Sequence, residues 1–334
     1  IALGQLWLEQ GKLEQALDLY RSAISQFPML PALFDGLGAV LEAMGKPKEA
    51  QEYIEQGIKI SPNSLQRQQS LGKLAKANGD FDNAVRAYRQ AVGLGQNSQF
   101  RDPESHLGLA VSLNHQAGEQ APNPRAVLEI RKTLGDMSKN WKGDNNLQVR
   151  AQLVEAQTLI KTGDQREADK LIKQASAQLG QLDTFFSSQV ALEVASQLKA
   201  LGQEEQAQGL LQTCAEMYGD DASVMAAIAE QTDDPAILNG GSAAQEFNRQ
   251  GIRHYQQKQY AEALTAFRQA QALQPRNISF ALNTAQSLLR MLLAQPDPQL
   301  KEQCLQCLEQ VRSMPPSDAR HERYQKLCKT VAGL

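Results

Sequence analysis

Residues 3–28 read LGQLWLEQGKLEQALDLYRSAISQFP, and the same pattern returns 34 positions later in residues 37–62, LGAVLEAMGKPKEAQEYIEQGIKISP. A third copy opens at residue 71 with LGKLAKANGDFDNAVRAY. The columns that share this period are Gly4, Gly38 and Gly72; Gly11, Gly45 and Gly79; Ala16, Ala50 and Ala84; Leu3, Leu37 and Leu71; and Tyr20, Ile54 and Tyr88. Several independent columns with one period indicate a repeat architecture.

Each repeat predicts two antiparallel helices joined by a tight turn. In the first copy, Leu3, Gly4 and Trp7 recur at helical spacing on one face. Gly11 then ends this helix, because glycine adopts the left-handed conformation without strain. A second helix follows until Pro28, whose ring cannot continue it.

The column residues also predict how the helices pack. The small residues Gly4 and Ala16 allow the two helices to approach closely, and Leu3, Trp7 and Tyr20 fill the space toward the next pair. A single pair leaves its apolar face exposed, but stacked pairs bury it. We therefore expect an all-α solenoid.

The pattern extends over nearly the whole chain. A fourth unit opens at Leu107, and an insertion at 116–123 delays its second helix to about Pro124. We expect a first array over 1–230, a loop or hinge at 231–243 that contains Asp-Asp-Pro and Asn-Gly-Gly, and two further repeats in 244–334. A helix at about 318–331 is expected to cap the array with its polar residues facing outward: Arg320, Glu322, Arg323, Lys326 and Lys329.

The composition agrees with close-packed helices. Of the 334 residues, 42% are hydrophobic but only 5% are aromatic, and 43 are glutamine. The net charge of −3 does not provide the basic surface that nucleic-acid binding requires, so we expect no nucleic-acid partner. No apolar run reaches the roughly 18 residues of a membrane span, so we expect no membrane insertion.

Four cysteines in so long a chain do not form a secreted disulfide framework, which favours a cytoplasmic protein. Extrapolation of the first repeat places the start of its helix before Ile1, so we expect sequence upstream, and a periplasmic location stays open.

The 34-residue helix-turn-helix unit, with its small-residue, aromatic and proline columns, resembles the tetratricopeptide repeat family. The resemblance implies a right-handed α-solenoid of about eight helix-turn-helix repeats with a C-terminal capping helix. It also implies that the first helices of successive pairs line a concave face that binds a protein or peptide partner.

No motif in the sequence predicts catalysis. The histidines, His106, His115, His254 and His321, lie in four different units, and Cys304 with Cys307 lacks the second pair that a zinc site needs. The glycine pair at 240–241 fits neither a phosphate-binding nor a dinucleotide-binding fingerprint. We expect a non-enzymatic protein with no catalytic, cofactor-binding or metal-binding residues.

Candidate partner-binding residues are the positions of the first helices that do not pack. They are Gln66, Gln69, Lys73 and Lys76 in the third unit, Gln189 and Lys199 in the sixth, and Asn248 and Tyr255 in the seventh. Trp141, between two lysines, is a further candidate. Lys73 and Lys76 could equally be an ordinary solvated face, and Trp141 could fill the edge of the irregular fourth unit.

Two classes of function follow. The first is an interaction scaffold, and the layout of the repeats also resembles the output half of bacterial response regulators, which act in signal transduction. The second is a structural role, either in a cell-envelope or polysaccharide-export machine or as a self-associating array, with a homodimer as its simplest form.

Overall fold

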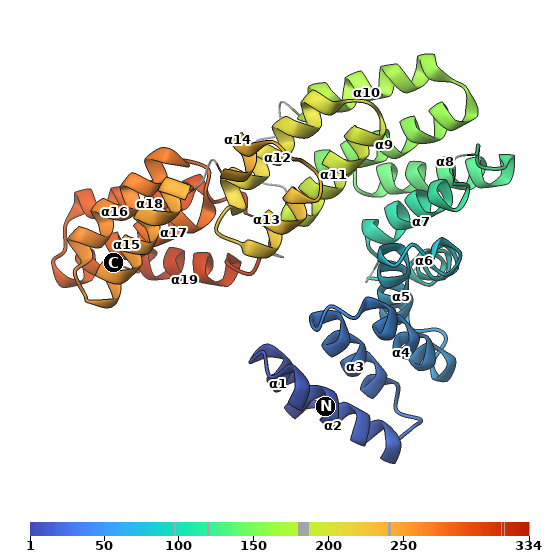
Figure 1. Ribbon diagram of the computed structural model, residues 1–334, viewed down its shortest axis with the longest axis horizontal. Coiled ribbons are helices and arrows are strands. Elements are labelled where there is room, and N and C mark those ends of the chain that lie inside the picture. The colour runs from blue at the N-terminus through green and yellow to red at the C-terminus, as the bar shows by residue number, and fades with distance from the viewer. Residues whose placement is uncertain are drawn as a thin grey trace. The chain divides into compact units, whose positions relative to one another are not determined.

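The computed structural model describes residues 1–96, 98–99, 101–118, 120–179, 187–239, 242–314, 316 and 318–333. Within these ranges the secondary structure consists of helices, and no strand occurs. The chain divides into two compact units, Ile1–Leu179 and Gly180–Leu334 (Figure 1). We refer to them as unit 1 and unit 2.

Unit 1 consists of helices that pack as antiparallel pairs. The pairs in its described residues are α1 (Ala2–Glu9) with α2 (Leu13–Gln26), α3 (Pro31–Ala43) with α4 (Pro47–Ile60), α5 (Leu65–Ala77) with α6 (Phe81–Gly95), α7 (Pro103–Gln116) with α8 (Pro124–Asn140), and α9 (Asn145–Thr162) with α10 (Gln165–Leu179).

Unit 2 adds three such pairs in its described part. They are α11 (Ser188–Ala200) with α12 (Glu204–Tyr218), α15 (Ser242–Gln256) with α16 (Tyr260–Leu273), and α17 (Ile278–Ala294) with α18 (Pro298–Gln310). The short helices α13 (Ala222–Ala229) and α14 (Pro235–Asn239) and the final helix α19 (His321–Ala332) complete it. The predicted α-solenoid of about eight repeats is confirmed.

The turns inside the pairs have the predicted left-handed conformation. Gly11, Gly45 and Gly79 have φ of +70°, +71° and +73°. The same turn between α15 and α16 carries Lys258 at φ +62°. A left-handed conformation costs a side-chain-bearing residue about 1–2 kcal/mol, so this turn is strained where the others are not.

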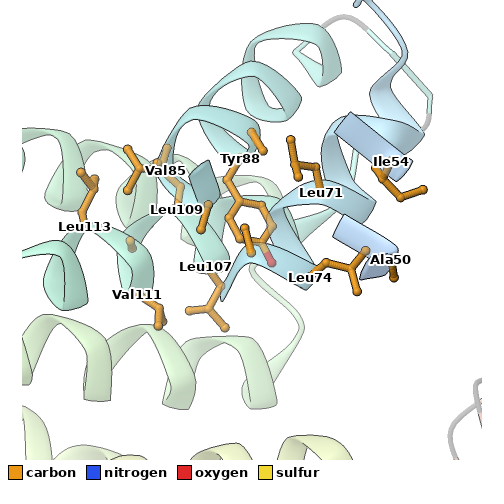
Figure 2. Packing of buried hydrophobic residues seen from close by; sticks show 14 of the residues in the cluster. Ala50, Ile54, Leu71, Leu74, Val85, Tyr88, Leu107, Leu109, Val111 and Leu113 are labelled. Carbon is orange, nitrogen blue, oxygen red and sulfur yellow. The ribbon is translucent and has the colours of Figure 1, made fainter. Parts of the chain in front are cut away.

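Tyrosine rings fill the space between neighbouring first helices in unit 1. A Cβ added to Gly4 or Gly36 would lie 2.6 or 2.3 Å from the Tyr20 ring, so glycine is required on both sides of it. Tyr88 lies in the same way against Gly72 and Gly108, and Figure 2 shows its ring beside the leucines of the adjacent helices. The predicted role of the small residues is confirmed.

The prediction for Leu3 is wrong. Its side chain is 48% exposed, whereas Leu37 and Leu71 in the same column are buried. Within the described residues α1 packs mainly against α2 and more weakly against α3, and the Leu3 side chain lies outside these contacts. Trp7, on the same helix, is half-buried and packs against the core.

The irregular fourth pair has a polar connection to its neighbour. Helix α7 ends at Gln116, and α8 begins at Pro124 with Ile130 fully buried. Lys161 Nζ donates to the carbonyl oxygens of Asn114 and Gly118, at 2.6 and 2.7 Å. An ammonium group at carbonyls that a helix end leaves without intrahelical partners stabilises that end.

The stretch 231–243, predicted as a loop or hinge, contains the one-turn helix α14. Its glycine pair, 240–241, lies outside the described residues. The division into 1–230 and 244–334 stays a prediction.

The prediction that the polar residues of the last helix all face outward is wrong for two of them. The Arg320 side chain is only 20% exposed, and Arg323 donates to the side-chain oxygen of Asn283 at 2.7 Å. Arg320 forms hydrogen bonds with Asp318 at 2.8 and 2.9 Å and with Ser279 Oγ at 3.0 Å. Helical spacing identifies a polar face, but it does not tell whether that face meets water or the polar side chains of a neighbouring helix.

Candidate partner-binding face

The first helices of the pairs in unit 1 are neighbours, α1 of α3, α3 of α5, α5 of α7 and α7 of α9, and we call the surface that they form the first-helix face. Successive helices on it are joined by polar bonds between side chains. Arg67 of α5 holds Asp35 of α3 through Nε and a terminal nitrogen, with distances of 2.7–3.1 Å. Lys73 Nζ lies 2.9 Å from Glu42 Oε1. The planar guanidinium fits a carboxylate with two parallel bonds, so the Arg67–Asp35 pair has the more specific geometry of the two.

The polar connections continue along α7 and α9. Gln69 donates to Asp102, which also accepts the N–H of Ser105 and begins α7. Glu104 accepts two bonds from Arg150, at 2.5 and 2.8 Å. The Arg150 side chain is 3% exposed, so this pair is well shielded from water on the arginine side.

A hollow of about 330 Å³ opens between α3 and α5 on the first-helix face. Its floor is apolar, with the buried side chains of Ile54 and Leu74. Small residues from the two helices flank it: Gly38 and Ala39 from α3, and Ser64 and Ser70 from the α5 side. Asp35, Glu42, Gln66, Arg67 and Gln69 complete the lining. The volume lies at the lower end of the range of about 300–1,000 Å³ for ligand pockets.

The four candidates of the third repeat therefore lie close together. Gln66 and Gln69 line the hollow, while Lys73 is paired with Glu42. Lys76 follows on the same helix and contributes a positive potential at His115. Lys73 and Glu42 are largely exposed, at 58% and 46%, so their pairing stabilises the face only weakly.

Of the candidates in unit 2, Lys199, Asn248 and Tyr255 take part in hydrogen bonds within the chain. Lys199 donates to the carbonyl oxygen of Gln231 and lies 3.5 Å from Glu204. Gln189 is exposed at the start of α11, beside a cavity of about 540 Å³. Three aspartates and Arg320 line that cavity as well, and Arg320 pairs with Asp318 and Asp220.

Asn248 and Tyr255 belong to a hydrogen-bonded network. Asn248 is buried and accepts a bond from Asn283 at 2.8 Å. The hydroxyl of Tyr255 accepts bonds from Gln286 at 3.1 Å and Arg290 at 3.0 Å. Arg323 of α19 bonds the side chains of Asn283 and Gln286, so the last helix lies against the polar residues of α17.

Trp141 ends α8 and is half-buried against the core of unit 1. Its ring meets His106 edge-on at 5.5 Å, and the Arg101 guanidinium lies 5.1 Å from its centroid. Burial is the largest influence on His106, and it lowers the pKa of that side chain. The environment of Trp141 favours the alternative in which it fills the edge of the fourth unit. Its role in partner binding stays a prediction.

The sequence did not predict the hollow, nor the group formed by Arg320 with Asp318, Asp220 and Ser279, which we call the Arg320 cluster. A signal for the hollow existed, because Ile54 breaks a column whose other members are Tyr20 and Tyr88. The Arg320 cluster has residues from three distant parts of unit 2, and no local sequence pattern predicts it.

In the part of the chain that the structure describes, no three His, Cys, Asp or Glu side chains are grouped to hold a metal ion. Cys304 is buried and donates to the Ala285 carbonyl at 3.3 Å, and burial raises its thiol pKa to about 11. A thiol with so high a pKa is a poor nucleophile. None of the helices in the described residues has both the length and the hydropathy of a membrane span.

Comparison with known families supports the repeat assignment. Sequence models described as "Tetratricopeptide repeat" match residues 2–28, 34–64, 70–121 and 244–277.

Individual relatives are distant. The human "Protein O-mannosyl-transferase TMTC1" is 25% identical over 54% of this chain, which covers 21% of that protein. "Cellulose synthase operon protein C" of Pseudomonas fluorescens is 31% identical over 39% of this chain, which covers 10% of that protein. A solved tetratricopeptide repeat protein from Parabacteroides merdae is 13% identical, with a TM-score of 0.47, over 86% of this chain and 97% of its own. The chain thus spans no more than about a fifth of these two sequence relatives.

Proposed function

We propose that this chain, a tetratricopeptide repeat protein, is a non-enzymatic scaffold that binds a protein or peptide partner on its first-helix face. The single observation that carries the proposal is the hollow between α3 and α5 on that face. It combines an apolar floor with a rim of amide and charged groups, as interaction sites do.

The rim is suited to an extended peptide. Gln66 is exposed, and its amide can both donate to and accept from a peptide main chain. The Arg67–Asp35 pair fixes the neighbouring helices against each other, so the site is largely formed before a partner arrives. A preformed site loses less conformational entropy on binding.

Affinity capture from the source cell with the full-length protein tests this function. Lys73→Glu combined with Lys76→Glu reverses two charges on α5, one of which is paired with Glu42 at the rim of the hollow, and we expect it to weaken capture of an acidic partner. Lys170→Glu with Lys173→Glu makes the same charge change on α10, a second helix, and serves as the matched control. Equal capture by both double variants would contradict binding on this part of the first-helix face.

Two finer roles are part of the proposal: the envelope or polysaccharide-export role, with which the name of one relative, "Cellulose synthase operon protein C", agrees, and the response-regulator output role. The coding sequence upstream of Ile1 separates them. A receiver domain would support the output role, and a secretion signal would support the envelope role. Light scattering over a concentration series tests the homodimer.

A further inference from the structure

Three successive spaces between first helices in unit 1 differ in what fills them. In the first space the Tyr20 ring lies against Gly4 and Gly36, and in the third the Tyr88 ring lies against Gly72 and Gly108. The rings stand so close to these glycines that a Cβ would come within 2.3–2.7 Å of a ring atom. Both spaces are filled by an aromatic side chain of the chain itself.

The middle space is different. The tyrosine column has Ile54 here, and Ser70 stands 34 positions after Gly36. Ile54 reaches Gly38, since a Cβ on that glycine would lie 2.8 Å from Ile54 Cδ1. The isoleucine side chain extends no further than this, however, and has no atoms where the outer part of a tyrosine ring would lie. The hollow of about 330 Å³ lies between the same two helices, with Ile54 in its floor.

We propose that this hollow binds a phenylalanine side chain of the partner, in the space that tyrosine rings fill in the two neighbouring repeats. The proposal rests on the proposed function and adds the side chain that the partner must carry. An aromatic ring fits because the hollow is flanked by small residues of two helices: Gly38 and Ala39 on α3, and Ser70 on α5.

The orientation of the incoming ring favours phenylalanine over tyrosine. Tyr20 belongs to a second helix, and its hydroxyl lies 3.3 Å from the Ile1 carbonyl oxygen. A partner ring enters from the opposite side, so its tip meets Ile54 and Leu74 at the floor. A hydroxyl at that tip would be buried against apolar side chains, and an unpaired buried hydroxyl is unfavourable.

Methyl NMR of the full chain tests the proposal with N-acetylphenylalanine amide as the probe. We expect the methyl resonances of Ile54 and Leu74 to show a saturable ring-current shift, with a dissociation constant of about 1 mM for so small a ligand. N-acetyltyrosine amide and N-acetylleucine amide should bind several-fold more weakly. No saturable shift at these methyls, or equal affinity for the leucine probe, would overturn the proposal.

Filling the hollow provides the second arm. Ile54→Tyr with Ser70→Gly recreates the tyrosine-and-glycine arrangement around Tyr20, and Ser70→Gly alone is its control. We expect the double variant to retain its helical circular dichroism and to bind the probe at least about tenfold more weakly, measured at the Leu74 methyls. Ser70→Phe covers the hollow from an exposed position and should do the same if the double variant does not fold. Unchanged affinity in a folded blocking variant would refute the site.

The two proposals can fail separately. If partner capture is unchanged in both blocking variants, the scaffold function is retained and the hollow is excluded as its binding site. If the probe binds at Ile54 but no partner is captured, the hollow is retained as a site for a phenylalanine side chain and the scaffold function is contradicted.

Discussion

Replacement of Arg320 by methionine is expected to loosen α19 from the rest of unit 2. The guanidinium bonds Asp318 twice and Ser279 once, and it lies 4.9 Å from the Tyr218 ring centroid. Burial raises the pKa of the Asp318 carboxyl, but the hydrogen bonds and charge of Arg320 outweigh burial and leave that pKa below its ordinary value. Methionine keeps the apolar stem, while the Asp318 carboxylate loses its charged partner.

The magnitude follows from these contacts. Removal of one partner from a fully buried ion pair costs about 3–5 kcal/mol. The Arg320 side chain is 20% exposed and Asp318 can rehydrate in part, so we expect about 2–3 kcal/mol. The effect should be local, because the stability of a repeat array is distributed over neighbouring interfaces.

Hydrogen exchange measured peptide by peptide is the suitable assay. A loss of 2–3 kcal/mol accelerates exchange of the α19 amides about 30- to 150-fold, whereas amides of unit 1 should keep their rates. Arg312→Met is the control, because that arginine is 73% exposed and pairs at 3.0 Å with the similarly exposed Glu309. Its replacement should cost less than about 0.5 kcal/mol. Equal exchange of α19 in the two variants would refute the role assigned to Arg320.

Three other predictions concern packing, backbone strain and pH. Ala84→Leu or Ala263→Leu places a larger side chain at a fully buried helix contact and should cost about 1–3 kcal/mol; unchanged thermal melting would show that the assigned register is wrong. Lys258→Gly relieves the left-handed turn between α15 and α16 and should stabilise unit 2 by about 0.5–1 kcal/mol in urea unfolding, whereas a loss of stability would contradict the strain. Burial lowers the pKa of His106, so the unfolded chain binds a proton at a higher pH than the folded chain, and stability should fall as the pH drops from about 7 to about 5. His106→Phe should flatten this pH dependence of the melting temperature, and an unaltered slope would contradict the role of His106.

The architecture could be predicted almost completely from the sequence, because it depends on local periodic features. Gly11, Gly45 and Gly79 mark turns that need a left-handed residue, and the 34-residue spacing of the buried alanines sets the register of the pairs. Such features act within one repeat or between neighbours, so a single sequence contains them in full.

The candidate partner-binding face was predicted only in part. Gln66 and Gln69 line the hollow as part of the expected face, yet Asn248 and Tyr255 are held by α17 side chains. A polar residue at a non-packing helical position looks the same in sequence whether it faces water or an amide of the next helix. Only the packed helices show which partner it has.

The repeated small and apolar residues already specify a stack of helix pairs, since no other arrangement buries their faces. Only the packed helices show that one space between first helices is left unfilled and that the last helix packs against polar neighbours. The space above Ile54 stays open because a short side chain stands where tyrosines stand on either side. The last helix closes onto polar neighbours because Arg320 and Arg323 find partners that lie about 40 to 100 residues earlier in the chain. Both outcomes depend on distances between separate helices, which no local pattern contains.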